Sequence, residues 1–244
     1  MAETPDPTTP TTPDPGRGAG LGRTLAVGVF ALVVGLYLGI SASGLGLGLG
    51  AGNPEPPAHD SVDVGFAQDM SVHHSQAVEM SAMALTNATD PAVRTLAYDV
   101  ITTQQSQWGT MQGWLAVWDR PLQPPGKPMT WMRATDNSAE AMPGMAEHTA
   151  MPSGPPGPLM PGMATTSELA TLRGTTGPAF DTLYLQLLLR HHQGGLPMAR
   201  DAAANASEQV VTTLARQIVD TQQAESTTMQ QLLTARGAAP LPMN

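Results

Sequence analysis

Apolar residues are spaced as in amphipathic helices along most of the chain after residue 60. Over 61–86 they fall mostly three or four positions apart, which predicts a helix with one buried face. Asp90 and Pro91 are typical of a helix start, because the carboxylate accepts free amide hydrogens and Pro fits the first helical position. A second helix is therefore predicted to run from there to about Trp118, forming a hairpin with the first.

The same spacing returns in the last third of the chain. It covers 165–173 and, after a Gly- and Pro-containing break, 179–204. A last helix is expected to begin at Ser207, as the capping residue, and to end near Gly237. Aromatic residues make up only 4% of the chain, which disfavours an aromatic-rich β core, so the predicted fold class is all-α.

A continuous apolar segment precedes the helical part. Residues 24–43 carry no charge, and about 20 apolar residues are what a helix needs to cross a bilayer. Arg17 and Arg23 lie before it and no charge follows until Glu55, so the positive-inside rule predicts a cytoplasmic N-terminus and an extracytoplasmic domain. Small residues over 41–43 leave a cleaved secretory signal as the alternative.

Pro- and Gly-rich stretches separate these segments and set the expected organisation. The prediction is a disordered cytoplasmic tail over 1–23, a transmembrane anchor over 24–43, a Gly/Pro tether over 44–60, a first helical hairpin over 61–122, a Met/Pro/Gly-rich connector over 123–164 and a second helical hairpin over 165–238.

The two hairpins are copies of one another, offset by the 118 residues between His73 and His191. The offset runs without a gap through both helices of each hairpin. It pairs His73 with His191, His74 with His192, Met80 with Met198, Leu96 with Leu214, Ala97 with Ala215, Met111 with Met229 and Leu115 with Leu233. Since neither hairpin can bury its apolar face alone, they are expected to pack as a ferritin-like four-helix bundle.

Composition limits the chemistry that such a bundle can do. The chain has no Cys, which excludes disulfides, thiolate nucleophiles and iron–sulfur ligation, but it has 15 Met. Its net charge is -9, and its Lys and Arg form no basic stripe, so no nucleic-acid partner is expected. The negative charge favours a metal cation as partner, and without Cys such an ion would have to bind through nitrogen, oxygen or thioether.

The repeated His and Met residues are the main candidate ligands. Residues three, four and seven apart share a helix face, so His73 aligns with Met80 and, one turn earlier, with Met70. Imidazole suits several transition metals, whereas thioether favours Cu(I), so the combination indicates copper. The predicted metal ligands are His73, His74, Met80, Met111, His191, His192, Met198 and Met229, with Met70, Gln104, Gln107, Gln222 and Glu225 as further candidates.

Two plainer interpretations stand beside this one. A Met on an apolar helix stripe is more often core packing than a ligand, and paired histidines can be satisfied within a core. The paired spacing Glu-x-x-His of di-iron bundles is missing from both hairpins, so iron is disfavoured.

The connector carries a second group of candidate ligands. Pro-Gly between methionines favours a turn that would bring two thioethers toward one ion. These candidates are Met142, Met145, His148, Met151, Met160 and Met163. The alternative is a flexible linker that is merely rich in Met.

The segment from His73 to Met80, with Gln104, Gln105 and Met111 after it, resembles a bacterial domain-of-unknown-function family that includes CopM-like, ferritin-like copper-binding proteins. The segment from Met160 through 191–198 is similar to the start of that family's second hairpin. The resemblance covers roughly residues 61–236 and implies a ferritin-like bundle outside the cytoplasm that binds copper. It departs at Pro197, which replaces the helix-compatible residue at the repeat-equivalent Glu79 and predicts a kink, and at Gly194 and Gly195, expected to loosen the same turn.

The sequence thus predicts a non-enzymatic, membrane-anchored envelope protein that sequesters or hands over copper, preferring Cu(I) and tolerating Cu(II). A homo-oligomer or a copper-transfer protein is a further expected partner. One alternative is a structural or partner-binding envelope module whose Met-rich surface provides adaptable contacts. Another is a zinc or redox enzyme that uses the paired histidines.

Overall fold

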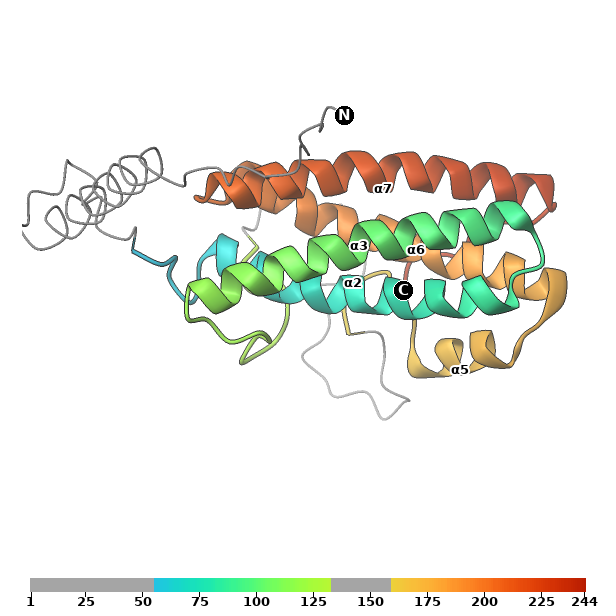
Figure 1. Ribbon diagram of the computed structural model, residues 1–244, viewed down its shortest axis with the longest axis horizontal. Helices are drawn as coiled ribbons and strands as arrows, with labels where there is room; N and C mark the ends of the chain where they lie inside the picture. Colours follow the sequence, from blue (N-terminus) through green and yellow to red (C-terminus); the bar gives the residue numbers. More distant parts are fainter. Residues whose placement is uncertain (1–54, 133–158) are drawn as a thin grey trace, which may run out of the picture. The chain divides into compact units, whose positions relative to one another are not determined.

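The computed structural model describes residues 55–132 and 159–244 of the chain. Every regular element in these ranges is an α-helix: α2 (Val62–Asn87), α3 (Pro91–Val117), α5 (Thr166–Gly174), α6 (Gly177–Asn205) and α7 (Gln209–Ala235). The four long helices run side by side along a common direction, and the short α5 lies at their edge (Figure 1). The prediction of an all-α helical bundle is confirmed.

The predicted anchor over 24–43 lies outside the described residues. Within 55–132 and 159–244, none of the helices has both the length and the apolar character needed to cross a membrane.

The four long helices form two hairpins that pack against each other. α2 packs on α3 and α6 packs on α7, while the two hairpins meet chiefly through α2 and α6. This pairing follows the internal repeat, because each copy supplies one inner helix and one outer helix.

Only one of the two outer helices begins as the sequence predicts. Asp90 caps α3 as predicted, accepting from the amide of Ala92 at 2.8 Å. For α7, the expected cap Ser207 is wrong: Glu208 occupies the capping position and makes no side-chain cap. The free amides of Ser207 and Glu208 instead donate to Asp63 of α2, at 3.2 and 2.8 Å. A buried carboxylate from the other hairpin thus replaces the local cap.

The core is divided into two hydrophobic clusters by a buried polar layer. One cluster joins the C-terminal half of α2 to the N-terminal halves of α3 and α6 and the end of α7. The other joins the opposite ends of the same helices. Between them each long helix contributes buried polar side chains: His73, His74, Gln104, His191, His192 and Gln222. The histidine layer, as we call these six residues, therefore crosses the middle of the bundle.

The ends of the connector pack against the second cluster. The Met129 amide and the Trp131 indole both donate to Asp69, at 2.6 and 2.7 Å. Trp131 lies so close to Gly65 that a Cβ there would meet its ring at 2.2 Å. Met160 and Met163 are buried in the same cluster. These parts of the predicted connector thus belong to the folded core.

Candidate metal centre

Four histidines lie at the centre of the bundle, where α2 and α6 pack together. All four side chains are fully buried. His73 of α2 and His191 of α6 stand face to face, with ring centroids 3.8 Å apart and planes tilted by 36°. The folded chain therefore brings together the two histidine pairs that the repeat predicted, in one layer and not in two separate sites.

Hydrogen bonds fix which ring nitrogen carries the proton in three of these histidines. Nε2 of His191 donates to the His73 carbonyl at 3.0 Å, and Nε2 of His192 donates to Glu225 at 2.7 Å. Nε2 of His74 donates to the side-chain oxygen of Gln107 at 2.8 Å. Each partner atom can only accept, so the proton resides on Nε2 and Nδ1 keeps its lone pair.

Most of the remaining polar atoms of the layer lack partners among the described residues. Nδ1 of His74, His191 and His192 has no hydrogen bond. The backbone of Pro161 lies near the His73 ring and raises its pKa, but neither nitrogen of His73 makes a hydrogen bond of good geometry. The amide groups of Gln104 and Gln222 are likewise buried and unpaired. Buried polar atoms are normally satisfied, so a concentration of such atoms in one layer marks it as a place where a ligand would be stabilised.

The same burial keeps the imidazoles of His73, His74 and His191 neutral. Burial lowers the pKa of His73 to about 3, and the nearby His74 and His192 act in the same direction. Burial also lowers the pKa of His74 to about 4, against the opposing hydrogen bond from Gln107. The pKa of His191 is pushed well below its usual range by burial and then by His73. Neutral imidazole is the form that binds metal ions, so these rings need lose no proton to act as ligands.

The repeated methionines lie above and below the histidine layer. Met80 and Met229 are buried in one hydrophobic cluster, and Met111 and Met198 are buried in the other. Seven residues separate His73 from Met80, which is about 10 Å along a helix. The structure therefore places these thioethers in the adjoining apolar layers. Met70, about one turn from His73, is the nearest of the predicted methionines along α2.

The connector methionines divide into two groups. Met160 and Met163 are buried in the cluster that also holds Met70, Met111 and Met198. Five of the predicted thioether ligands thus share one cluster beside the histidine layer, called the methionine cluster below. Met142, Met145, His148 and Met151 lie outside the described residues.

Among the residues that the structure describes, no group of three or more His, Asp or Glu side chains is arranged to hold one metal ion.

Two glycines of α6 allow other parts of the chain to approach the layer closely. A Cβ on Gly195 would meet the ring of His73 at 2.9 Å and the Gln222 side chain at 3.2 Å. A Cβ on Gly194 would meet the Pro161 carbonyl at 2.2 Å. The expectation that these glycines loosen the helix is therefore wrong, because they are sites of tight contact. α6 also continues through Pro197 to Asn205.

Comparison with known proteins places the chain in a family. The family described as a domain of unknown function, DUF305, matches residues 63–233. The chain belongs to the DUF305 family. The family resemblance inferred from the paired histidines is thereby confirmed. No curated protein sequence matches this DUF305 chain.

Solved structures support the DUF305 fold. A Streptomyces coelicolor DUF305 protein, predicted to be secreted, is 39% identical, with a TM-score of 0.63, covering 76% of this chain and 99% of its own. A DUF305 fragment from Deinococcus radiodurans is 30% identical, with a TM-score of 0.54, covering 75% and 99%. CopM in its Cu(I)-bound form is 24% identical, covering 71% and 96%, with a TM-score of 0.49. So distant a likeness carries no functional argument, and function must be argued from this chain's own residues.

Proposed function

We propose that this DUF305 protein binds copper at the histidine layer, preferring Cu(I), and sequesters it or passes it on without catalysing a reaction. The observation that carries the proposal is the common state of His74, His191 and His192. Each is buried, holds its proton on Nε2 through a fixed acceptor, and leaves Nδ1 unpaired.

This arrangement is the one that metal-binding histidines usually adopt. Such a ring donates its second nitrogen to a carboxylate, a backbone carbonyl or a similar acceptor, which orients the ring and makes the other nitrogen a better ligand. Glu225, the His73 carbonyl and Gln107 serve as these acceptors here. These three acceptors orient the rings in the way that metal-binding histidines need, and this supports the proposal that the layer binds a metal ion.

The neighbouring sulfur atoms support copper over other metals. The methionine cluster adjoins the layer, and thioether sulfur favours Cu(I) among the common metal ions. Imidazole nitrogen is accepted by Cu(II) as well. We place the bound ion outside the cytoplasm, in keeping with the charge pattern around residues 24–43 and with the predicted secretion of the Streptomyces relative.

A competition titration of the full-length chain with Cu(I) and a coloured chelator tests the proposal. The expected dissociation constant is below about 1 µM, and the double variant His73→Gln/His191→Gln should raise it at least about tenfold. His59→Gln, which changes an exposed histidine, is the matched control and should leave it unchanged. Binding no tighter than micromolar, or equal affinity in the double variant, would contradict the proposal.

A structural or partner-binding module is the second candidate, because the buried methionines also fill the core as ordinary apolar side chains. Thermal unfolding separates the two. A ligand that binds only the folded chain raises the melting temperature as its concentration rises. Ag(I), a redox-inert substitute for Cu(I), should do so under the copper proposal, whereas an unchanged melting temperature favours the module.

A further inference from the structure

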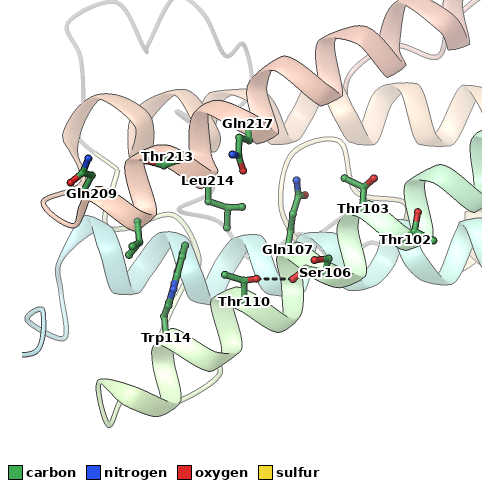
Figure 2. Close-up of a pocket in the computed structure, with 11 residues that line it drawn as sticks. Thr102, Thr103, Ser106, Gln107, Thr110, Trp114, Gln209, Thr213, Leu214 and Gln217 are labelled. Carbon is green, nitrogen blue, oxygen red and sulfur yellow. Dashed lines mark hydrogen bonds between the residues drawn. The ribbon is translucent and has the colours of Figure 1, made fainter.

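A groove lies between the two outer helices, and one of its lining residues is hydrogen-bonded to the histidine layer. It has a volume of about 780 Å³ and is lined only by residues of α3 and α7 (Figure 2). Gln107 is one of the lining residues, and its side-chain oxygen accepts from Nε2 of His74 at 2.8 Å. Since His74 itself is fully buried, Gln107 is the side chain that separates this part of the layer from the groove.

The groove exists because the outer helices pack on different partners and most of the side chains that α3 presents to it are short, with Trp114 as the exception. α3 packs chiefly on α2, and α7 chiefly on α6. The α3 wall consists largely of hydroxyl residues, including Ser106 and Thr110, which are too short to fill the gap (Figure 2). Across it lie Val210, Leu214 and Gln217 of α7.

The internal repeat explains why the groove lies in this half of the bundle. At the other end, Arg236 after α7 donates to the carboxylate of Asp90 at the start of α3, which ties the two outer helices together. The repeat-equivalent positions are Trp118 and Glu208, which cannot form an ion pair. The link that joins the helices at one end therefore has no ionic counterpart beside the groove.

We propose that the groove between α3 and α7 is the route by which a metal ion reaches and leaves the histidine layer, with Gln107 as the side chain that must move aside. The inference rests on the proposed function, since it needs a metal to be bound there. The lining residues carry no charge, so the groove gives a hydrated cation weak, exchangeable oxygen contacts and does not retain it.

A route, unlike a binding site, controls rates and not affinity. Narrowing it raises the barrier for uptake and release equally, because the free and bound end states are unchanged. Val210→Trp suits this test, since Val210 lines the groove but is half exposed and belongs to neither the layer nor the methionine cluster. Gln217→Trp, at another exposed lining position, gives an independent second variant.

Stopped-flow uptake of Ag(I) by the full-length chain, with release into excess chelator, provides both rates. Val210→Trp and Gln217→Trp should slow uptake and release by at least about tenfold while leaving the dissociation constant unchanged. Val117→Trp introduces the same side chain at an exposed position of α3 outside the groove, and it should change neither rate. Thermal unfolding first establishes which variants retain the fold.

A second control uses the internal repeat. Ala92 is exposed and is the repeat-equivalent of Val210, so Ala92→Trp places the indole at the matching position on α3. Its rates should equal those of the unmodified chain. Equal slowing by Ala92→Trp, unaltered rates in both groove variants, or a weakened dissociation constant in them would overturn the groove as the route. Failure of every protein to bind Ag(I) would instead contradict the proposed function.

Discussion

At the scale of single residues, the central feature is a set of imidazoles that the fold keeps uncharged. An exposed histidine would release copper as it gains a proton near its ordinary pKa of about 6.5. Burial moves the pKa of His73 to about 3 and that of His74 to about 4. The nitrogens of these rings therefore stay unprotonated in mildly acidic surroundings, where the sequence alone would leave only the thioethers unprotonated.

These shifts predict that the protein loses stability in mild acid. In the unfolded chain the histidines take up protons below about pH 6.5, whereas His73, His74 and His191 in the folded chain do not until the pH is far lower. The unfolded state thus binds more protons between about pH 4 and 6.5, and each of these histidines lowers the free energy of unfolding by up to about 1.4 kcal/mol per pH unit there. The stabilisation is complete above pH 6.5 and declines as the pH falls.

Urea unfolding at pH 7 and pH 5 measures this effect. The unmodified chain should be several kcal/mol less stable at pH 5, and His73→Gln/His191→Gln should show a clearly smaller difference. His59→Gln, at an exposed position, should behave like the unmodified chain. Equal stability at the two pH values would show that the histidines are not held neutral by burial.

The methionine cluster should affect the affinity for Cu(I) more than the affinity for Cu(II). Leu replaces buried Met with little change in volume, so Met70→Leu/Met198→Leu should cost less than about 3 kcal/mol of stability. If the thioethers bind copper, the variant should lose Cu(I) affinity and keep Cu(II) affinity, because Cu(II) prefers imidazole. Met243→Leu, at a half-exposed position, is the control. Unchanged Cu(I) affinity would assign these methionines to packing alone.

At the scale of helices, each hairpin completes a helix of the other. Asp181 of α6 accepts from the amides of Thr89 and Asp90 at the start of α3, at 2.9 and 3.0 Å. Asp63 of α2 does the same for the start of α7. We call these two interactions crossed caps, because in each an Asp of one hairpin caps a helix of the other. Asp63 and Asp181 are repeat-equivalent positions, so the crossed caps are related by the same offset as the histidines.

Removing a crossed cap should destabilise the whole bundle. Asp181→Ala leaves the amides of Thr89 and Asp90 without their acceptor in a partly buried site, at a cost of about 1–3 kcal/mol. Asp99→Ala, at an exposed position of α3, should change stability by less than about 0.5 kcal/mol. Chemical unfolding measures both values. A cost for Asp181→Ala no larger than the control would mean that water replaces the cap.

Replacing two helical glycines by Ala should change the stability of the chain in opposite directions. Gly194→Ala would force a Cβ to 2.2 Å from the Pro161 carbonyl, so the connector or α6 must shift, costing at least about 1–3 kcal/mol. Gly113→Ala on α3 meets nothing within 4 Å and should stabilise the chain by about 0.5–1 kcal/mol through helix propensity. Thermal unfolding measures both effects: Gly194→Ala should melt below the unmodified chain, and Gly113→Ala should melt above it.

At the scale of the whole molecule, the repeat predicted more than any single segment. The spacing of apolar residues predicted the long helices, and the shared offset predicted two hairpins with equivalent histidine pairs. The repeat did not predict that both histidine pairs lie in a single layer, because the contact between His73 and His191 depends on how α2 and α6 pack against each other. The burial of Met160 and Met163 was also missed, since a Pro-Gly turn looks like a linker until a packing partner is known.

The sequence also did not predict which side chains accept hydrogen bonds from the histidines. Gln107 and Glu225 stood among the candidates as possible ligands, because they share a helix face with other polar residues. In the structure each accepts a hydrogen bond from Nε2 of a histidine, so its side-chain oxygen is already engaged in orienting that ring. Sequence periodicity places a residue on a face, but it does not tell which partner on another helix that residue will meet.

The crossed caps also bear on the order in which the chain is made. Thr89 leaves the ribosome long before its acceptor Asp181, which follows 92 residues later. Until then the first hairpin has an unfinished helix start and an uncovered inner face. A truncated product ending within the second copy would therefore expose an apolar surface of the kind that chaperones and proteases recognise, so quality control would act on the pair and not on either copy alone.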